Sequence, residues 1–271
     1  MVRTACIQLN SGAEIQPNLE AAASLIRQAA EQGAQFIATP ENSCHMRARQ
    51  EDRLETSMPE ETHRGVPFFS KLAQEYGIWL LVGSMSIRLE GGHLANRSFL
   101  FNDKGALLAR YDKIHLFDVD LPTGESHRES NLVKAGTEAV TVKMPWGTLG
   151  MSICYDLRFS YLYRDLARAG ASILAVPAAF TVPTGQAHWD VLLRARAIET
   201  GSFVVAPAQC GTHEGGRKTY GHSMIISPWG EILAEGDAEP GIIIADLDLS
   251  EVSKARQAIP ALQHDRDYLV L

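Results

Sequence analysis

The first forty residues contain a strand, a helix and a second strand in close succession, and this order constrains the fold most. Thr4–Leu9 alternates apolar and polar residues, which is typical of a strand with one buried face. A helix is predicted from Asn18, as its N-cap, to Gly33, where glycine can adopt the left-handed conformation that ends a helix. Gln35–Thr39 is a second short apolar strand, ended by Pro40. Such an order favours a right-handed crossover and parallel pairing, as in α/β proteins.

The remaining chain continues to mix crossovers with hairpins. Helices are predicted over residues 67–76, 161–169 and 188–200 and from about residue 250. Strands are predicted over residues 79–84, 97–102, 106–111, 140–143, 148–153, 172–176, 202–207, 220–226, 231–234 and 242–247. Residues 44–62 are polar and lack a clean period, so we expect a loop with a short helix near the entrance to a site. No linker or repeat interrupts the chain, and a single domain over residues 1–271 with packed sheets covered by helices is predicted.

Composition excludes several classes of function. With 45% hydrophobic and 21% charged residues among 271, the chain has the make-up of an ordinary globular protein. Its net charge of −7 without a basic block argues against nucleic-acid and anionic-membrane partners. No apolar run has the length of a membrane span, and residues 1–9 have the pattern of a strand rather than the apolar region of a signal peptide. The four cysteines are widely spaced without a C-x-x-C pair, which favours free thiols in a reducing cytoplasm over disulfides or a zinc site.

Cys154 lies where an apolar strand, Thr148–Ile153, gives way to a polar segment that leads into a helix. Backbone N–H groups and the helix dipole at such a point favour a thiolate and can also bind a developing oxyanion. A cysteine in a strand is, taken alone, more often a buried structural residue. Two other residues at strand ends, Glu41 and Lys113, favour a catalytic role for Cys154 over a structural one, because the three together form a workable site for acyl transfer.

Glu41 directly follows the strand Gln35–Thr39, and Lys113 follows the strand over residues 106–111. In α/β sheets, ligands bind at the carboxyl ends of strands, so both side chains are placed where chemistry occurs. A carboxylate there can act as a general base, and an ammonium group can stabilise an oxyanion. On position alone, Glu41 is equally well explained as an ordinary loop carboxylate, and Lys113 better as a surface lysine.

Three blocks of the sequence are similar to the signature blocks of the nitrilase superfamily of carbon–nitrogen hydrolases. They are Thr39-Pro-Glu-Asn42, Arg110-Tyr-Asp-Lys-Ile-His-Leu-Phe-Asp118 and Gly150-Met-Ser-Ile-Cys-Tyr-Asp-Leu-Arg-Phe159. The blocks occur in the expected order, and the resemblance covers nearly the whole chain. It implies an α/β fold with four layers, an αββα sandwich, that pairs into a homodimer or larger homo-oligomer. It also implies an enzyme without cofactor or metal ion.

The same resemblance assigns roles within the site. It implies that Cys154 is the nucleophile, Glu41 the general base and Lys113 the residue that stabilises the tetrahedral intermediate. The backbone N–H of Tyr155 would complete the oxyanion hole. Phe180 is expected close to the site.

A second glutamate of the family, which positions substrate or base, falls on Glu129. Glu125 is its nearby rival, and the Glu-Ser pair favours Glu129. Cys44 is close to Glu41 in sequence, but none of the three blocks gives it a role.

Within the superfamily, the sequence over residues 186–200, 208–211 and 220–224 resembles most the amidases that cleave ω-amides of 2-oxo acids, such as deaminated glutathione, and the related ω-amidases. Such a substrate carries a carboxylate, so a cationic end of the pocket is required. Candidates to bind it are Arg158, Arg194 and Arg196, although Glu199 lies three residues after Arg196 and an ion pair within the helix explains that arginine equally well. His188 and Trp189 are candidates to line the pocket, or form a packed start of a helix.

The predicted activity is therefore a thiol amidohydrolase that cleaves the amide bond of a small molecule through a thioester acyl-enzyme. A nitrilase or an N-carbamoyl amidohydrolase would use the same three residues and is a rival within enzymes. A catalytically silent scaffold of the same fold is a rival of another class, as is a thiol redox sensor. The sequence lacks G-x-S-x-G, H-E-x-x-H, Walker and G-x-G-x-x-G motifs, and its histidines lack the spacing of metal ligands.

Overall fold

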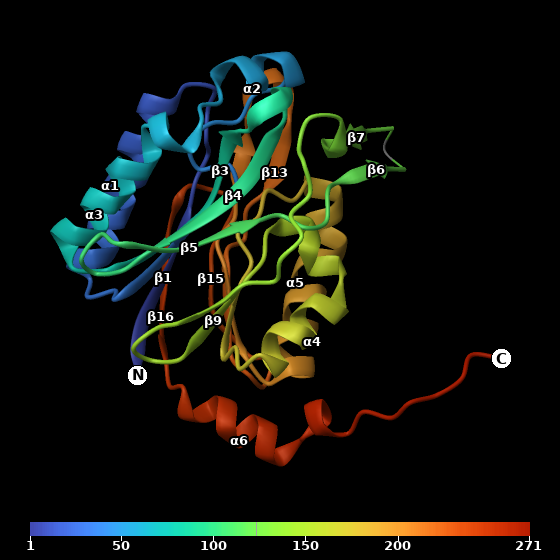
Figure 1. Ribbon diagram of the computed structural model, residues 1–271. Helices are drawn as coiled ribbons and strands as arrows, with labels where there is room; N and C mark the ends of the chain where they lie inside the picture. Colours follow the sequence, from blue (N-terminus) through green and yellow to red (C-terminus); the bar gives the residue numbers. More distant parts are fainter. Residues whose placement is uncertain (123) are drawn as a thin grey trace.

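Two six-stranded sheets face each other in residues 1–122 and 124–271, which the computed structural model describes (Figure 1). The first sheet has the strand order β16-β1-β2-β3-β4-β5. Its strands are β1 (Val2–Gln8), β2 (Phe36–Thr39), β3 (Trp79–Arg88), β4 (Leu94–Phe101), β5 (Leu107–Asp112) and β16 (Gly241–Leu247). The second sheet has the order β15-β14-β11-β10-β9-β8. Its strands are β8 (Thr141–Lys143), β9 (Thr148–Met151), β10 (Ile173–Ala175), β11 (Phe203–Ala206), β14 (Met224–Ile226) and β15 (Ile232–Glu235).

Helices cover the outer face of each sheet (Figure 1). The first sheet is covered by α1 (Ile15–Glu31) and α3 (Gly65–Tyr76), and the second by α4 (Ser160–Arg168) and α5 (Val182–Thr200). The expected αββα sandwich is thereby confirmed. A short helix, α2 (Gln50–Thr56), and two small hairpins, β6 (Asp118–Asp120) with β7 (Ser126–Arg128) and β12 (Cys210–Thr212) with β13 (Lys218–Tyr220), lie at one end, and α6 (Ser250–Ala258) lies at the other (Figure 1).

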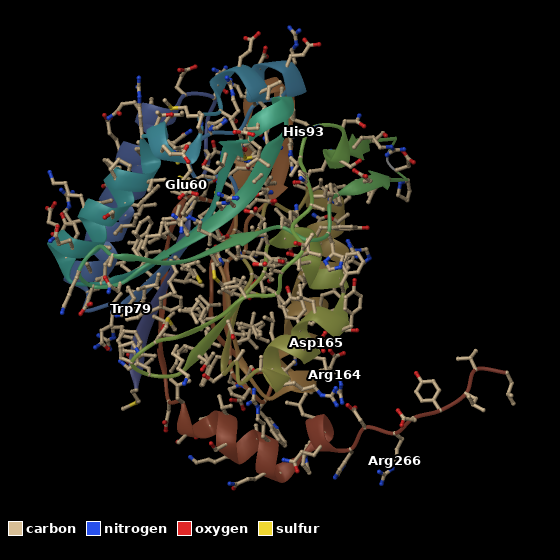
Figure 2. The ribbon with its side chains drawn as sticks, in the orientation of Figure 1. Glu60, Trp79, His93, Arg164, Asp165 and Arg266 are labelled. Atoms are coloured by element: carbon tan, nitrogen blue, oxygen red, sulfur yellow. The ribbon has the colours of Figure 1, made fainter. Side chains whose placement is uncertain are left out.

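The alternation along the central strands produces the two apolar layers. In β3, Leu80 and Val82 pack toward α1 and α3, whereas Trp79 and Leu81 pack toward the second sheet. Both sets are buried, because the sheet is covered on both faces. Side chains fill the space between the sheets (Figure 2), and Trp79 meets Trp146 edge-on there at a centroid distance of 6.2 Å. The parallel strands β1, β2 and β3 confirm the crossover that was predicted from the first forty residues.

The start of α1 differs from the prediction. Asn18 lies inside the helix, which begins at Ile15, with Pro17 in the first turn, where no N–H donor is needed. The buried Asn18 amide instead binds the N–H and C=O of Gly12 and the carbonyl of Cys44, at 2.8–2.9 Å. The end of the helix agrees with the prediction, since Gly33 has a φ of 86°.

The prediction for α5 was also wrong at its start, because the helix begins at Val182 rather than at residue 188. Its first four residues, Val-Pro-Thr-Gly, are typical of a loop, yet proline is well suited to the first helical turn. Gly185 is required by packing, since a Cβ atom there would lie 2.2 Å from the ring of Tyr220.

The strand predicted over residues 220–226 is in fact two strands. Tyr220 pairs with Cys210 in the hairpin of β12 and β13, whereas β14 pairs with β15. The break falls at Gly221 and His222, which both have positive φ values, of 74° and 55°. The loop and short helix expected over residues 44–62 are confirmed as α2 and a 3-10 turn at Glu60–Thr62. Among the described residues, no helix has the length and apolar character needed to cross a membrane.

Candidate active site

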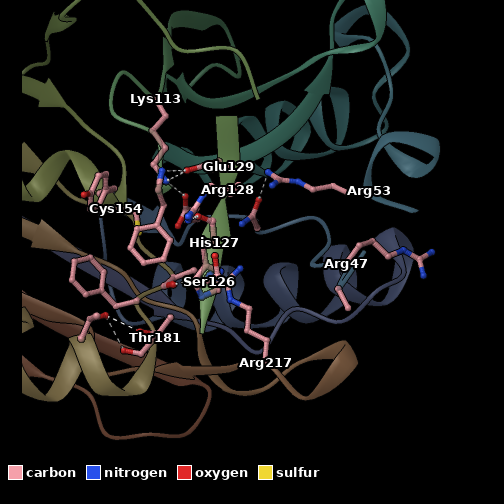
Figure 3. A pocket seen from close by; sticks show the side chains of 18 residues that line it. Arg47, Arg53, Lys113, Ser126, His127, Arg128, Glu129, Cys154, Thr181 and Arg217 are labelled. Atoms are coloured by element: carbon pink, nitrogen blue, oxygen red, sulfur yellow. Dashed lines mark hydrogen bonds and ion pairs between the residues drawn. The ribbon is translucent and has the colours of Figure 1, made fainter. Parts of the chain in front are cut away.

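Glu41, Lys113 and Cys154 line one cavity of about 220 Å³ (Figure 3). Each follows the end of a strand: Glu41 comes after β2, Lys113 directly after β5 and Cys154 after β9. The first two strands belong to one sheet and the third to the other, so the cavity lies where the two sheets meet. All three side chains are buried, with 4%, 2% and 7% of the residue surface exposed. The structure thus brings together the three residues that the sequence selected.

Lys113 lies between two carboxylates. Its Nζ donates to Oε1 of Glu41 at 2.8 Å and to Oε2 of Glu129 at 2.9 Å. Burial alone would lower the pKa of Lys113, but attraction to Glu129 and Glu41 outweighs it and raises that pKa. Burial would likewise raise the pKa of Glu129, yet Lys113 and Arg53 lower it to about 2. Lys113 is therefore an ammonium group and Glu129 a carboxylate at neutral pH.

Asn96, on β4, holds both carboxylates from a third direction. Its Nδ2 donates to Oε1 of Glu41 at 2.8 Å and to Oε1 of Glu129 at 3.1 Å, and its Oδ1 accepts from the hydroxyl of Ser84. Sequence reasoning missed this residue. The available signal was a polar side chain at a buried position of a strand, since buried amides are generally hydrogen-bonded.

The backbone at Cys154 is held in a conformation that non-glycine residues rarely adopt, with a φ of 51°. Its N–H donates to the carbonyl of Pro177 at 2.9 Å, and a 3-10 turn over Cys154–Arg158 begins at this residue. N–H groups in the first turn of a helix have no partner within the helix, so the N–H of Tyr155 can serve an oxyanion.

The thiol of Cys154 is not pre-ionised, in contrast to the expectation from the helix terminus. Burial raises the pKa of Cys154 well above its usual value, and the Glu41 carboxylate raises it further, while Lys113 and the backbone of Ala179 act in the opposite direction. The resting cysteine is therefore a thiol. Such a thiol needs a base to remove its proton before it can attack a carbonyl group.

Asp156 fixes the turn that carries the nucleophile. It is fully buried, and its Oδ2 accepts from the N–H of Ile153 at 2.9 Å and from the hydroxyl of Tyr111 at 2.6 Å. Its Oδ1 accepts from the N–H of His115 at 2.9 Å. Because Tyr111 belongs to β5, this carboxylate connects the turn after β9 to the strand that Lys113 directly follows.

Glu129 and Glu125, the two candidates for the second glutamate of the family, lie in different surroundings. Glu129 contacts Lys113 and Asn96, and its Oε2 also accepts from the N–H of Phe117 at 2.8 Å. Glu125 is 3.5 Å from a nitrogen of His127, and its side chain is 49% exposed. Of these two glutamates, Glu129 contacts Lys113 and Glu125 does not.

Phe180 lines the cavity, whereas three other candidates lie outside its lining in the described part of the chain. Trp189 is buried behind Phe180, at a centroid distance of 4.8 Å, and its Nε1 donates to the carbonyl of His222. Arg158 lies over the rings of Phe180 and Tyr155 at 5.8 and 5.9 Å, with His188 3.2 Å from its guanidinium group. The structure therefore places Arg158, His188 and Trp189 behind the lining of this cavity rather than in it, and Arg158 and Trp189 pack against Phe180, which does line it.

Two further arginines of α5 are engaged elsewhere. Arg196 is buried, donates to the carbonyl of Leu157 at 3.0 Å and pairs with Glu199 at 2.9 Å, so the intrahelical ion pair is confirmed. Arg194 donates to the carbonyl of Gly230 at 2.9 Å. Neither is among the residues that line the cavity.

Four other arginines, none of them predicted from the sequence, line the cavity: Arg47, Arg53, Arg128 and Arg217. They come from three distant segments, namely the loop before α2 with α2 itself, the end of β7 and the hairpin of β12 and β13. No short motif links these segments, so only their convergence in space reveals a cationic pocket. In the described residues, no group of three or more His, Cys, Asp or Glu side chains is arranged to hold a metal ion.

Comparison with known proteins gives consistent results. The sequence model of the carbon–nitrogen hydrolase family matches residues 3–257. The deaminated glutathione amidase of Synechocystis is 42% identical over 266 residues, which cover 96% of each chain.

Solved structures agree with this similarity. The NitFhit protein of Caenorhabditis elegans matches with a TM-score of 0.92 and 35% identity, over 98% of this chain and 65% of that longer one. The Nit3 protein of Saccharomyces cerevisiae, described as a member of the nitrilase superfamily, matches with a TM-score of 0.87 and 29% identity, over 97% and 96% of the two chains.

Proposed function

Since this chain belongs to the carbon–nitrogen hydrolase family, we propose that it is a thiol amidohydrolase in which Cys154, Glu41 and Lys113 carry the reaction. Membership in that family makes it a hydrolase of carbon–nitrogen bonds other than peptide bonds. The observation that carries the proposed mechanism is the convergence of a buried thiol, a buried carboxylate and a buried ammonium group on one cavity.

The first half of the reaction forms an acyl-enzyme. Glu41 takes the proton of the Cys154 thiol as the sulfur attacks the amide carbonyl carbon. The negative charge that develops on the carbonyl oxygen is stabilised by the ammonium group of Lys113 and the N–H of Tyr155. Glu41 then returns the proton to the departing nitrogen, the C–N bond breaks, and a thioester to Cys154 remains.

The second half uses water. Glu41 removes a proton from a water molecule, and the resulting hydroxide attacks the thioester carbonyl. The C–S bond breaks, the acid leaves, and the proton on Glu41 returns to the sulfur of Cys154. Glu129 keeps Lys113 in place throughout and balances its charge, because it remains ionised beside it.

For the substrate we propose an ω-amide of a 2-oxo acid, such as deaminated glutathione. The Synechocystis relative bears that name, and two of the four arginines that line the cavity, Arg53 and Arg217, form no ion pair among the described residues, which suits an anionic substrate. An ω-amidase acting on α-ketoglutaramate, a nitrilase and an N-carbamoyl amidohydrolase are the alternatives with the same chemistry.

The test measures product release from deaminated glutathione, α-ketoglutaramate, glutaramide and a simple nitrile, for the wild type and for Cys154→Ala. We expect the wild type to hydrolyse deaminated glutathione fastest and the variant to release no product. Turnover of the nitrile alone would contradict the proposed substrate class. Absence of turnover on all four would favour the catalytically silent scaffold.

We also propose that the chain forms a homodimer or a larger homo-oligomer in a reducing cytoplasm. Large apolar side chains are exposed on the outer helices, namely Tyr161 on α4 with Val191 and Ile198 on α5. Burying them against a second copy would remove this surface from water. All four cysteines are free, as a thiol enzyme in a reducing compartment requires. Light scattering coupled to size exclusion would measure the assembly, and a monomeric mass would contradict it.

A further inference from the structure

A second cavity, of about 660 Å³, adjoins the one that contains Cys154. The two share part of their lining, which consists of Arg47, Ala48, Ser126, His127 and Arg217. Beyond this common wall, the second cavity is bounded by the start of α5 and by the turn of the hairpin of β12 and β13. A molecule whose amide bond lies at Cys154 can therefore extend past these residues into the second cavity.

The arginines around the two cavities differ in their partners. Arg47 pairs with Glu14 at 2.9 Å and with Glu214 at 3.2 Å, and its side chain points away from the centre of the cavity in Figure 3. Arg128 pairs with Asp120 at 2.7 Å. Both guanidinium groups are thus already neutralised by carboxylates.

Arg217 has no such carboxylate partner among residues 1–122 and 124–271. Its guanidinium group donates to the carbonyl of Ala179 at 3.2 Å, and its Nε is buried without a hydrogen-bond partner. It also lies near a like charge: burial is the main cause that lowers the pKa of Arg53, Glu129 and Glu41 act in the opposite direction, and Arg217 lowers that pKa further. An unpaired cation beside another cation is a place where an anion binds favourably.

The position of Arg217 is fixed by its surroundings. It follows the turn Glu214–Gly216, in which a Cβ atom on Gly215 would lie 2.4 Å from Cβ of Ala48. Its contact with Ala179 places it beside the backbone that faces the Cys154 thiol. In Figure 3, Arg217 and Lys113 enter the cavity from opposite sides.

The size of a peptide leaving group fits this arrangement. Deaminated glutathione releases a cysteinylglycine dipeptide, whose carboxylate lies about 7 Å from the scissile nitrogen when the dipeptide is extended. α-Ketoglutaramate releases only ammonia and has no group to place there. The second cavity offers the volume, and Arg217 the charge, that the larger and anionic leaving group requires.

We propose that the second cavity is the leaving-group subsite and that Arg217 binds the carboxylate of a departing dipeptide. This inference rests on the proposed amidase function and names a residue that determines its specificity. Arg217 would thereby favour ω-amides with an anionic peptide on nitrogen over unsubstituted ω-amides.

The test is a double-change cycle, in which the cation of Arg217 is removed from the protein, the glycine carboxylate is removed from the substrate, or both are removed. Wild type and Arg217→Met are assayed on deaminated glutathione and on its analogue with the glycine carboxylate converted to a carboxamide. We expect each single change to lower kcat/KM by about tenfold to a hundredfold, because a hydrogen-bonded ion pair is lost. The two changes together should lower it little further. α-Ketoglutaramate is the third substrate, and its loss in the variant should be at least tenfold smaller.

Arg49→Met is the matched control, since Arg49 is exposed and lines neither cavity. It should leave all three substrates unaffected. Equal losses on deaminated glutathione and α-ketoglutaramate, or additive losses in the cycle, would overturn the assignment of Arg217. The wild type with the carboxamide analogue needs no variant, so an unchanged kcat/KM there overturns it even if Arg217→Met folds poorly. Failure of the wild type on all amides would instead refute the amidase function, and the subsite with it.

Discussion

The two sheets supply different parts of the candidate active site. The first sheet positions charged and amide groups, namely Glu41 after β2, Asn96 on β4 and Lys113 after β5. The second sheet positions Cys154 after β9 and the N–H of Tyr155 in the following turn. Neither sheet alone contains both a nucleophile and a base. The chemistry therefore depends on how the two sheets pack together.

Backbone strain occurs on both sides of this division. Asn42, next to Glu41, has a φ of 59°, and Cys154 has a φ of 51°. A left-handed conformation at a residue other than glycine costs on the order of 1–3 kcal/mol, so the surrounding contacts must hold it. Gln209 holds the first turn by donating to the carbonyl of Glu41 at 2.9 Å, and Asp156 holds the second.

The largest expected effect comes from changing the sulfur that the second sheet supplies. Cys154→Ser keeps the shape of the side chain but replaces the thiol with a hydroxyl group that Glu41 activates poorly. We expect kcat on deaminated glutathione to fall by at least about 10⁴-fold, with an unchanged melting temperature. Mass spectrometry of the wild type under rapid quench should detect the acyl adduct on Cys154, and its appearance on another residue would refute the assignment.

The base supplied by the first sheet is tested by Glu41→Gln. The amide keeps an oxygen for Lys113 and Asn96 but cannot accept the thiol proton, so kcat should fall by about 10²- to 10⁴-fold. The rate at which substrate acylates Cys154 under rapid quench should fall in parallel, because burial keeps the thiol protonated and the variant lacks the base that removes its proton during attack.

Glu20→Gln, on the exposed face of α1, is the matched control for the loss of one carboxylate. An acylation rate in Glu41→Gln equal to that of the wild type would show that another group deprotonates Cys154.

Substituting Glu129 or Glu125 should lower kcat by less than the two changes above, and the two variants should differ from each other. Glu129→Gln weakens the hold on Lys113, and we expect kcat on α-ketoglutaramate to fall by about 10- to 100-fold. Glu125→Gln should change it by less than threefold, because Glu125 contacts His127 rather than Lys113. A larger loss in Glu125→Gln than in Glu129→Gln would reverse the choice between them.

The smallest effect is on stability and depends on pH. The pKa of Glu129 is lowered from 4.5 to about 2 in the folded protein, so its contribution is fully present above about pH 4.5 and is lost as the pH falls toward 2. The gap in unfolding free energy between wild type and Glu129→Gln should be roughly 3 kcal/mol near neutral pH. Urea unfolding at pH 6, 4.5 and 3 should show that gap shrinking, whereas a constant gap would contradict the depressed pKa.

Much of the architecture follows from local patterns. The apolar strands, the crossover from β1 to β2 and the glycine that ends α3 at position 77 agree with the sequence prediction. The predicted starts of two helices were wrong, because the residues there are compatible with more than one local structure. Asn18 has the chemistry of an N-cap but binds Gly12 and Cys44 from within α1. The opening of α5 contains proline and glycine, which also occur in loops.

Local sequence patterns are sufficient to identify the residues at the strand ends. Glu41, Lys113 and Cys154 could be selected because a strand pattern and three signature blocks are local in the chain. The sequence also favoured Glu129 over Glu125, and the structure places Glu129 against Lys113. Such features can be predicted from the sequence because they depend on neighbours within a few residues.

The surroundings of those residues, in contrast, depend on the packing of segments that are distant in the sequence. Asn96 and Arg217 reach the site from segments that no local motif connects to Cys154. The state of the thiol also depends on this packing, because burial and the charge of Glu41 outweigh the helix terminus. Charge and desolvation act through space over several ångströms, so they depend on which segments pack together rather than on the order of residues along the chain.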